Sequence, residues 1–289
     1  MWTTGTLTAA IAFCLAAPAL AQPAGPAEET IEVVGKREQE RRKTIRNFVG
    51  ALSSEPTNEP MTRFDTACPE VAGLSAAQNE AIAQRMRVVA AAAAVPLANP
   101  GCRPNVLVIV IPDKDAMLKA LRKRYPTLFR NGDRKPINIL RDDSPATAWH
   151  IRVDVDRQGQ QLPLAGGISV VAVDMSTRIY SAFRPVSIAG IVLLEQAGIV
   201  GLTTNQIADY ATMRAFSTLD SAQLTRTSAP TILRLLDSKI GDETPLSLTT
   251  WDLAFLKAAY AVPAYRYSGR QRAEIQSRIN RELRQSVGQ

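Results

Sequence analysis

The amino-acid sequence predicts an α+β fold: a mixed or antiparallel sheet flanked by helices, with a helical C-terminal part. The order of elements carries this prediction. Helices and one strand come first, several closely spaced strands follow, and the chain from residue 203 onward reads as helical. Hydrophobic residues make up 46% of the 289 residues, which is enough for a buried core. We expect a single domain over residues 36–265.

The N-terminal region predicts an export signal. Its first 21 residues carry no charged side chain, include an apolar stretch over residues 7–20, and end in a small-x-small cleavage site at Ala21. We therefore expect a signal peptide over residues 1–21 and a mature protein in the periplasm or outside the cell. An N-terminal anchor helix is the alternative. Residues 22–29 are proline-rich and should form a flexible leader.

Apolar spacing and capping residues predict the helices of the first half. Residues 36–52 place apolar side chains three, four and seven positions apart. Residues 75–94 read as an alanine-rich helix capped by Ser75. Residues 113–125 read as a helix capped by an aspartate, with basic residues in its last turn. Residues 53–69 are predicted to be a loop.

Strand signals occupy the middle of the chain. Residues 105–112, NVLVIVIP, form a continuous β-branched run that predicts a central strand covered on both faces. Residues 169–174, 179–183 and 188–194 predict further strands, spaced for antiparallel pairing. Residues 149–156 alternate, and they predict a strand whose solvated face carries His150, Arg152, Asp154 and Asp156.

Capped helices complete the chain. Residues 203–216 begin with Thr203 and Gln206 in capping-box spacing and carry a narrow alanine stripe that would let the helix lie close to a sheet. A short helix is expected in PTILRLLD, residues 230–237, and a longer one over residues 249–260. A basic helix follows within residues 266–289.

Cysteines and charge limit the class of protein. Without the signal peptide two cysteines remain, Cys68 and Cys102, and in an oxidising compartment we expect them to form a disulfide. Two separate buried thiols are the alternative.

The net charge of +7 is concentrated at the two ends, in residues 36–46 and 266–284. Basic ends on a near-neutral body argue against a nucleic-acid-binding surface and leave solvated helix faces or a weak contact with anionic membranes.

Catalytic patterns are absent from the sequence. His150 is the only histidine, so a zinc site of the HExxH kind cannot form, and no metal or cofactor is expected. A Ser/His/Asp triad would have to recruit His150 from a distance, with Ser144 as one candidate nucleophile. The adjacent carboxylates of Asp142 and Asp143 precede Ser144-Pro145 and read as a turn. We expect a protein that is not an enzyme.

Several longer strings carry a resemblance. IEVVGKRE, CPEVAGL, GCRPNVLVIV, LTTNQIADYATMRAF, PTILRLLD and LTTWDLAFLKAAY together resemble an uncharacterised family of secreted proteins of Gram-negative bacteria. The last of these strings is also similar to a late helix of matrixin-like zinc peptidases. In those enzymes an earlier helix bears the metal ligands, and here residues 206–210, QIADY, stand in that place. The resemblance implies a degenerate zincin-like arrangement, a pseudoenzyme without metal ligands.

The segment Thr30-Ile31-Glu32-Val33-Val34-Gly35 resembles a TonB box, the extended segment by which outer-membrane transporters engage TonB. The resemblance implies that these six residues bind TonB or another periplasmic or outer-membrane protein by adding a strand to its sheet. The α-rich pattern of the remaining chain does not supply a transporter barrel.

The sequence therefore predicts a non-enzymatic periplasmic interaction or accessory protein. Two other classes stay open. One is a metal-independent hydrolase, which requires a pocket at His150 or Asp209 with raised carboxylate pKa values. The other is a binder of anionic membrane surfaces that uses the basic ends of the chain.

Overall fold

The computed structural model describes residues 27–131, 144–166, 168–171, 177–238 and 243–287. The predicted signal peptide and the first part of the leader lie outside these residues. The chain divides into two compact units, Met1–Gln39 and Glu40–Gln289. The basic C-terminal region belongs to the second unit and does not form a unit of its own.

The first described element is the long helix α1, Ala27–Ala51, which spans both units. The helix predicted over residues 36–52 is confirmed within it, and the predicted core side chains Ile45, Phe48, Val49 and Leu52 are buried. Residues 30–35 are helical here, whereas the sequence predicts an extended segment. Extending an existing helix avoids the cost of nucleation, and β-branched residues lower helix propensity by only tenths of a kcal/mol.

The second unit is built around a mixed four-stranded sheet, as the fold class predicts. Its strand order is β1-β2-β6-β3. The strands β1 (Pro69–Ala72), β2 (Val106–Ile111) and β6 (Arg184–Glu195) run parallel, and β3 (Ala146–Val155) pairs antiparallel with β6. The predicted central strand is β2, which lies between two neighbours.

Three strand predictions differ from the structure. Strand β1 begins at Pro69, the last residue of the predicted loop. Of the described residues 169–171, only Ser169 is in a strand, the two-residue β5 (Ile168–Ser169), which pairs with β4 (Leu164–Ala165). Residues 172–174 lie outside the described part. Residues 179–183 form a single bridge, between Tyr180 and Arg266. Ile179 is 47% exposed, which shows that this apolar segment does not pack against the sheet.

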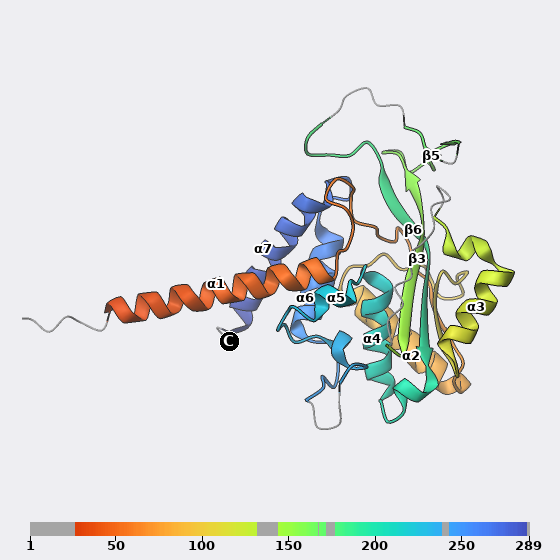
Figure 1. Ribbon diagram of the computed structural model, residues 1–289, viewed down its shortest axis with the longest axis horizontal. Helices are drawn as coiled ribbons and strands as arrows, with labels where there is room; N and C mark the ends of the chain where they lie inside the picture. Colours follow the sequence, from red (N-terminus) through yellow and green to blue (C-terminus); the bar gives the residue numbers. More distant parts are fainter. Residues whose placement is uncertain (1–26, 132–143, 167, 172–176, 239–242, 288–289) are drawn as a thin grey trace, which may run out of the picture. The chain divides into compact units, whose positions relative to one another are not determined.

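Helices cover the two faces of the sheet unequally. On one face, α2 (Ala76–Ala92) and α4 (Thr204–Phe216) pack together over the main core, and the predicted alanine stripe of α4 is buried. Figure 1 shows α3 (Lys114–Arg124) on the other side of the sheet from α4. There α3 and the 3₁₀ turn η1 (Pro126–Phe129) cover a smaller core that includes Ile111, Trp149 and Leu193.

The C-terminal helices pack against the main core. Helix α6 (Thr250–Ala261) contacts α7 (Ser268–Val287), and Ile275, Ile279 and Leu283 of α7 are buried. The remaining elements are short: η2 (Gln196–Ile199), α5 (Ser221–Leu224) and η3 (Ile232–Arg234). The helix expected in PTILRLLD is thus a single 3₁₀ turn, because Thr231 caps Leu233 and Asp252 binds the amide of Ile232.

Candidate functional site

A hollow of about 280 Å³ lies where the C-terminal end of α4 meets β3 and the chain that follows α1. Polar side chains from four separate parts of the sequence line it, and we call it the polar cavity. Its residues are Ser54, Glu55, Pro56, Thr62, Asn131, Ala148, Trp149, His150, Arg152, Arg214, Ser217, Thr218 and Leu219.

Arg214 is the most unusual residue of the polar cavity. It lies near the end of α4, and its side chain is only 8% exposed. One terminal nitrogen donates to the hydroxyl of Tyr210 at 3.3 Å, and the guanidinium lies 5.9 Å from the centre of that ring. Within the described part of the chain, its Nε has no hydrogen-bond partner and no carboxylate forms an ion pair with it. A buried charge without an opposite charge beside it is costly, so this site favours an anion.

Glu55 supplies the buried carboxyl group of the polar cavity. Its two oxygens accept hydrogen bonds from the amide of Thr62 at 2.9 Å and from the hydroxyl of Thr218 at 2.9 Å. Burial raises the pKa of Glu55, and these two hydrogen bonds and the charge of Arg152 oppose that rise only in part. Arg152 itself forms an ion pair with Glu59 at 3.3 Å.

His150 lies on β3, half-buried beside the ring of Phe64. Its Nε2 donates to the carbonyl of Ala215 at 2.7 Å, because a carbonyl can only accept. In the neutral ring Nδ1 is therefore the acceptor. Burial, and secondarily the charge of Arg214, lower the pKa of His150, while the bond to Ala215 opposes them. The prediction of a solvated strand face is wrong for His150, since α4 and Phe64 cover it.

The structure separates His150 from the candidate nucleophile Ser144. Ser144 precedes β3 by two residues, and the strand places His150 about 13 Å from its first residue, Ala146. The carbonyl of Ser144 instead accepts a hydrogen bond from Lys114 Nζ at 2.7 Å. Asp142 and Asp143 lie outside the described residues.

The second place where a pocket could form, Asp209, is filled by the protein itself. The fully buried carboxylate of Asp209 accepts two hydrogen bonds from Arg85, at 2.8 and 2.9 Å, and one from the amide of Leu248 at 2.6 Å. The neighbouring Gln206 completes the predicted capping box with Thr203. In the described ranges no cluster of histidine, cysteine and acidic residues could hold a metal ion.

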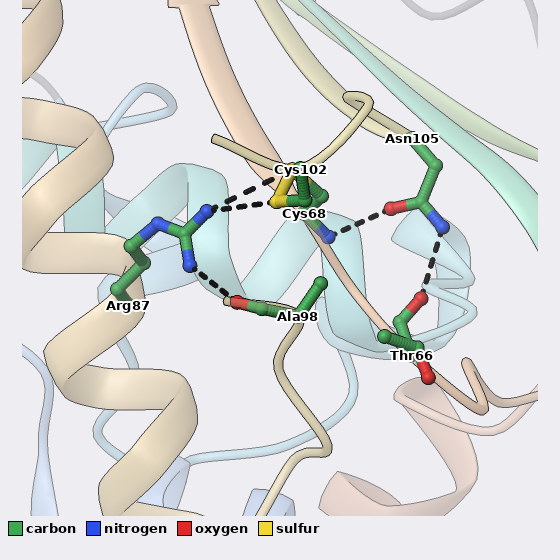
Figure 2. Close-up of a disulfide and its surroundings, with 6 residues drawn as sticks. All are labelled: Thr66, Cys68, Arg87, Ala98, Cys102 and Asn105. Carbon is green, nitrogen blue, oxygen red and sulfur yellow. Dashed lines mark hydrogen bonds between the residues drawn. A yellow bond between two sulfur atoms is a disulfide. The ribbon is translucent and has the colours of Figure 1, made fainter. Parts of the chain in front are cut away.

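The predicted disulfide between Cys68 and Cys102 is confirmed, with an S–S distance of 1.99 Å. Figure 2 shows the guanidinium of Arg87 directed at it, 3.2 Å from the sulfur of Cys102. On the other side, the side chain of Asn105 accepts from the amide of Cys68 at 2.7 Å and donates to the carbonyl of Thr66 at 2.9 Å. The bond is consistent with a protein of an oxidising compartment.

Of the helices described, none is both long and apolar enough to cross a bilayer.

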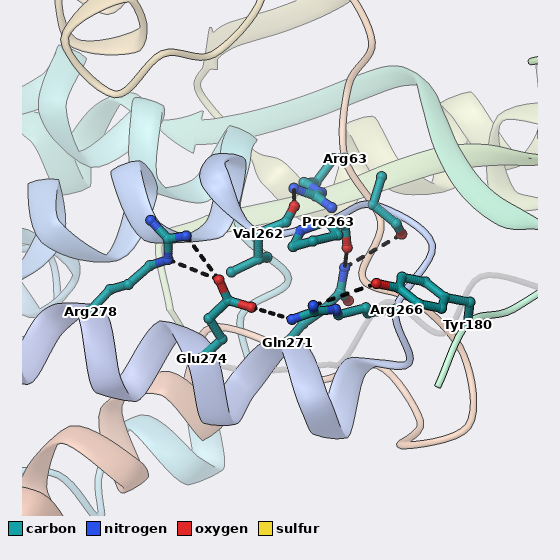
Figure 3. Close-up of polar contacts among 9 residues, drawn as sticks. Arg63, Tyr180, Val262, Pro263, Arg266, Gln271, Glu274 and Arg278 are labelled. Carbon is teal, nitrogen blue, oxygen red and sulfur yellow. Dashed lines mark hydrogen bonds and ion pairs between the residues drawn. The ribbon is translucent and has the colours of Figure 1, made fainter. Parts of the chain in front are cut away.

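The basic residues of α7 and the turn before it are partly engaged within the protein. Figure 3 shows Arg266 and Arg278 reaching the carboxylate of Glu274 from opposite sides, at 2.7 and 2.8 Å. Arg272 donates to the carbonyls of Ser53 and Glu55, the second of which is a residue of the polar cavity. These bonds use part of the positive charge to attach the helix.

The six residues predicted to bind a partner, Thr30 to Gly35, lie in the first turns of α1. Comparison of the chain with protein-family models, with curated proteins and with solved structures finds no match in any of the three. The family resemblance, the zincin-like arrangement and the TonB box therefore stay predictions.

Sequence reasoning missed Glu55 and Arg214, which the fold brings to one cavity across about 160 residues. Glu55 stands in a predicted loop without any local signal. Arg214 did have one: it is the only basic residue in the run of residues 206–216, all of which are buried in α4. A single arginine inside an otherwise buried helix needs an explanation.

Proposed function

We propose that this protein is a non-enzymatic binding protein of the periplasm that holds a small carboxylate in the polar cavity. The observation that carries the proposal is Arg214, a buried arginine that faces the cavity without an acidic partner in the described part of the chain. An arginine fork matches a carboxylate in shape and charge, so a bound carboxylate would supply the missing partner.

The other groups of the polar cavity favour a ligand that also carries a hydrogen-bond donor. Glu55 and the Nδ1 atom of neutral His150 both accept hydrogen bonds, and the lining has several hydroxyl groups. A hydroxyl or amine next to the carboxylate could donate to one of these acceptors. The volume of about 280 Å³ lies at the small end of the range for ligand sites.

Binding rather than catalysis is supported by the bonds that the polar groups already make. Nε2 of His150 is bonded to Ala215, Glu55 is bonded to Thr62 and Thr218, and the hydroxyl of Ser217 donates to the carbonyl of Met213 at 2.6 Å. No nucleophile in the described chain has a hydrogen bond to His150 that would activate it.

Calorimetry with three related probes tests this function. Lactate should bind more tightly than propionate, which lacks the hydroxyl group, and neutral lactamide should not bind. In Arg214→Gln the affinity for lactate should fall by about 10- to 100-fold, the worth of a charge-assisted hydrogen bond. Arg270→Gln, at an exposed arginine of α7, is the matched control and should bind like the wild type. Unchanged affinity in Arg214→Gln would refute the proposal.

A second function, hydrolysis, is favoured by one observation: the pKa of the buried Glu55 is raised in the same cavity as His150. A carboxyl group with a raised pKa and an imidazole acceptor in one cavity could serve as an acid and base pair. Turnover of p-nitrophenyl acetate that disappears in both Glu55→Gln and His150→Gln would support it. Equal rates in the wild type and both variants would leave binding as the function.

The partner proposal rests on residues 30–35. We propose that this segment leaves its helix and adds as a strand to the periplasmic domain of TonB, the role implied by its resemblance to a TonB box. The cost of unwinding these six helical residues would have to be repaid on binding, which makes the contact weak. Crosslinking of the mature protein to that domain, with and without residues 28–36, tests the contact, and equal capture of both forms would exclude it.

A further inference from the structure

The second face of the sheet carries an apolar groove beside α3. Half-buried aliphatic side chains of β2 and β6 line its sheet side, and residues of α3, Tyr125 and η1 line its other side. Its volume is about 660 Å³, more than twice that of the polar cavity. We call it the apolar groove; its residues are Arg103, Pro104, Asn105, Leu107, Ile109, Leu121, Tyr125, Leu128, Ile188, Ala189 and Ile191.

The groove exists because α3 covers only part of this face. The small core beneath α3 includes Ile111, Leu193 and Phe129, toward the C-terminal ends of the parallel strands. Toward the other ends of these strands the apolar side chains continue, but the described helices no longer cover them. Tyr125 and Ile188 are each 49% exposed there. Exposed apolar surface of this kind marks a place where another apolar group binds.

The charged side chain in the described lining of the groove is basic. Arg103 belongs to its lining and is exposed, and the guanidinium of Arg124 lies 5.8 Å from the centre of the Tyr125 ring. No acidic residue is among the residues that line the groove in the described chain. An apolar trough with arginines beside it complements a molecule with an apolar chain and an anionic head.

We propose that the apolar groove binds a single-chain anionic amphiphile, with the acyl chain along the sheet and its carboxylate at Arg103 and Arg124. The volume suits one chain, because drug-sized ligands occupy sites of roughly 300–1,000 Å³. This inference is independent of the carboxylate proposed for the polar cavity. The two sites share no lining residue, so variants of one leave the other intact.

Calorimetry with fatty acids below their micellar concentrations tests the proposal. Affinity should rise by about tenfold for every two methylene groups between hexanoate and laurate, since each buried methylene contributes roughly 0.8 kcal/mol. Ile188→Glu should weaken laurate binding at least tenfold by placing a carboxylate in the groove. Its matched control is Ile168→Glu, at a 66% exposed isoleucine of β5 outside the groove, which should not change the affinity.

The contribution of the arginines is tested separately from that of the acyl chain. Arg103→Gln should weaken laurate about threefold, as expected for an exposed charge pair, and leave the neutral ester glycerol monolaurate unchanged. Arg270→Gln should change neither. Arg214→Gln, which should weaken the binding of a small carboxylate in the polar cavity, should bind laurate with the affinity of the wild type.

Two outcomes would overturn the proposal that the apolar groove binds an amphiphile. One is laurate affinity that is equal in the wild type and Ile188→Glu, or that does not depend on chain length. The other is a wild-type dimer that Ile188→Glu converts to monomers and that laurate does not dissociate, because the groove would then be an interface between two copies.

Discussion

At the scale of single residues, Asp209 and Asp65 accept the same two-bond ion pair from an arginine in very different surroundings. The side chain of Asp209 is fully buried beside Arg85, whereas that of Asp65 is 52% exposed beside Arg184. Exposed pairs contribute little because water solvates both charges, while a buried partner cannot be replaced by water.

We therefore expect Asp209→Ala to lower the free energy of unfolding by about 2–3 kcal/mol, since Arg85 and the amide of Leu248 both lose their acceptor. Asp65→Ala should lower it by less than about 1 kcal/mol. Urea denaturation measures both. Equal losses in the two variants would show that burial does not decide the strength of these pairs.

The pKa of His150 can be measured from a single imidazole resonance, because His150 is the only histidine in the sequence. Its pKa should lie below the ordinary value of 6.5, mainly because it is buried. The unfolded chain then takes up a proton near pH 6.5 and the folded chain only at lower pH. The contribution of His150 to stability is thus fully present above pH 6.5 and is lost as the pH falls through the folded pKa.

Nuclear magnetic resonance of the imidazole gives that titration directly. In His150→Gln, the part of the pH dependence of stability that begins below pH 6.5 should disappear. A midpoint at or above 6.5 would contradict the effect assigned to burial.

At the scale of elements, α7 shows how a basic helix can be structural. Its apolar side chains Ile275, Ile279 and Leu283 are buried, while Arg270 and Arg281 are exposed. Removing the helix to test membrane binding would also remove part of the core. Charge-neutralising changes at the two exposed arginines are the sharper test of an anionic membrane contact.

Accordingly, Ile279→Ala should lower the free energy of unfolding by about 2–4 kcal/mol, through lost burial and the cavity that it leaves. Arg281→Ala should change it by less than about 0.5 kcal/mol. Thermal or urea unfolding distinguishes the two. A large loss in Arg281→Ala would show that its charge attaches the helix.

Some elements of the fold could be predicted from the sequence and others could not. Strand β2 and helices α2 and α6 were predictable because their signals are local: a β-branched run, or a cap followed by apolar spacing. Strand β1 was not, because four residues carry no period and its strand state depends on pairing with β2, over 30 residues away. The polar cavity depends on such distant contacts, so the sequence analysis named only His150 and Arg152 of its charged and titratable residues, although Arg214 carried a local signal.

At the scale of the whole molecule, the disulfide joins the start of β1 to the loop before β2 and closes a loop that contains α2. The sequence separation is 34 residues. Constraining such a loop in the unfolded chain contributes roughly 4 kcal/mol in the chain-entropy model.

The double variant Cys68→Ser, Cys102→Ser should therefore be about 3–4 kcal/mol less stable than the oxidised protein. Reductant should lower the stability of the wild type and leave the variant unchanged. Unfolding curves that coincide for oxidised wild type and variant would contradict this contribution.

The central claim, that the polar cavity holds a small carboxylate through Arg214, is tested most directly by the imidazole resonance of His150, which lines the same cavity. Lactate is added to the wild type and to Arg214→Gln at constant pH and ionic strength. We predict a shift that saturates in the wild type and is absent, or needs at least tenfold more lactate, in Arg214→Gln. No saturable shift in the wild type, or the same shift in both proteins, would contradict the claim.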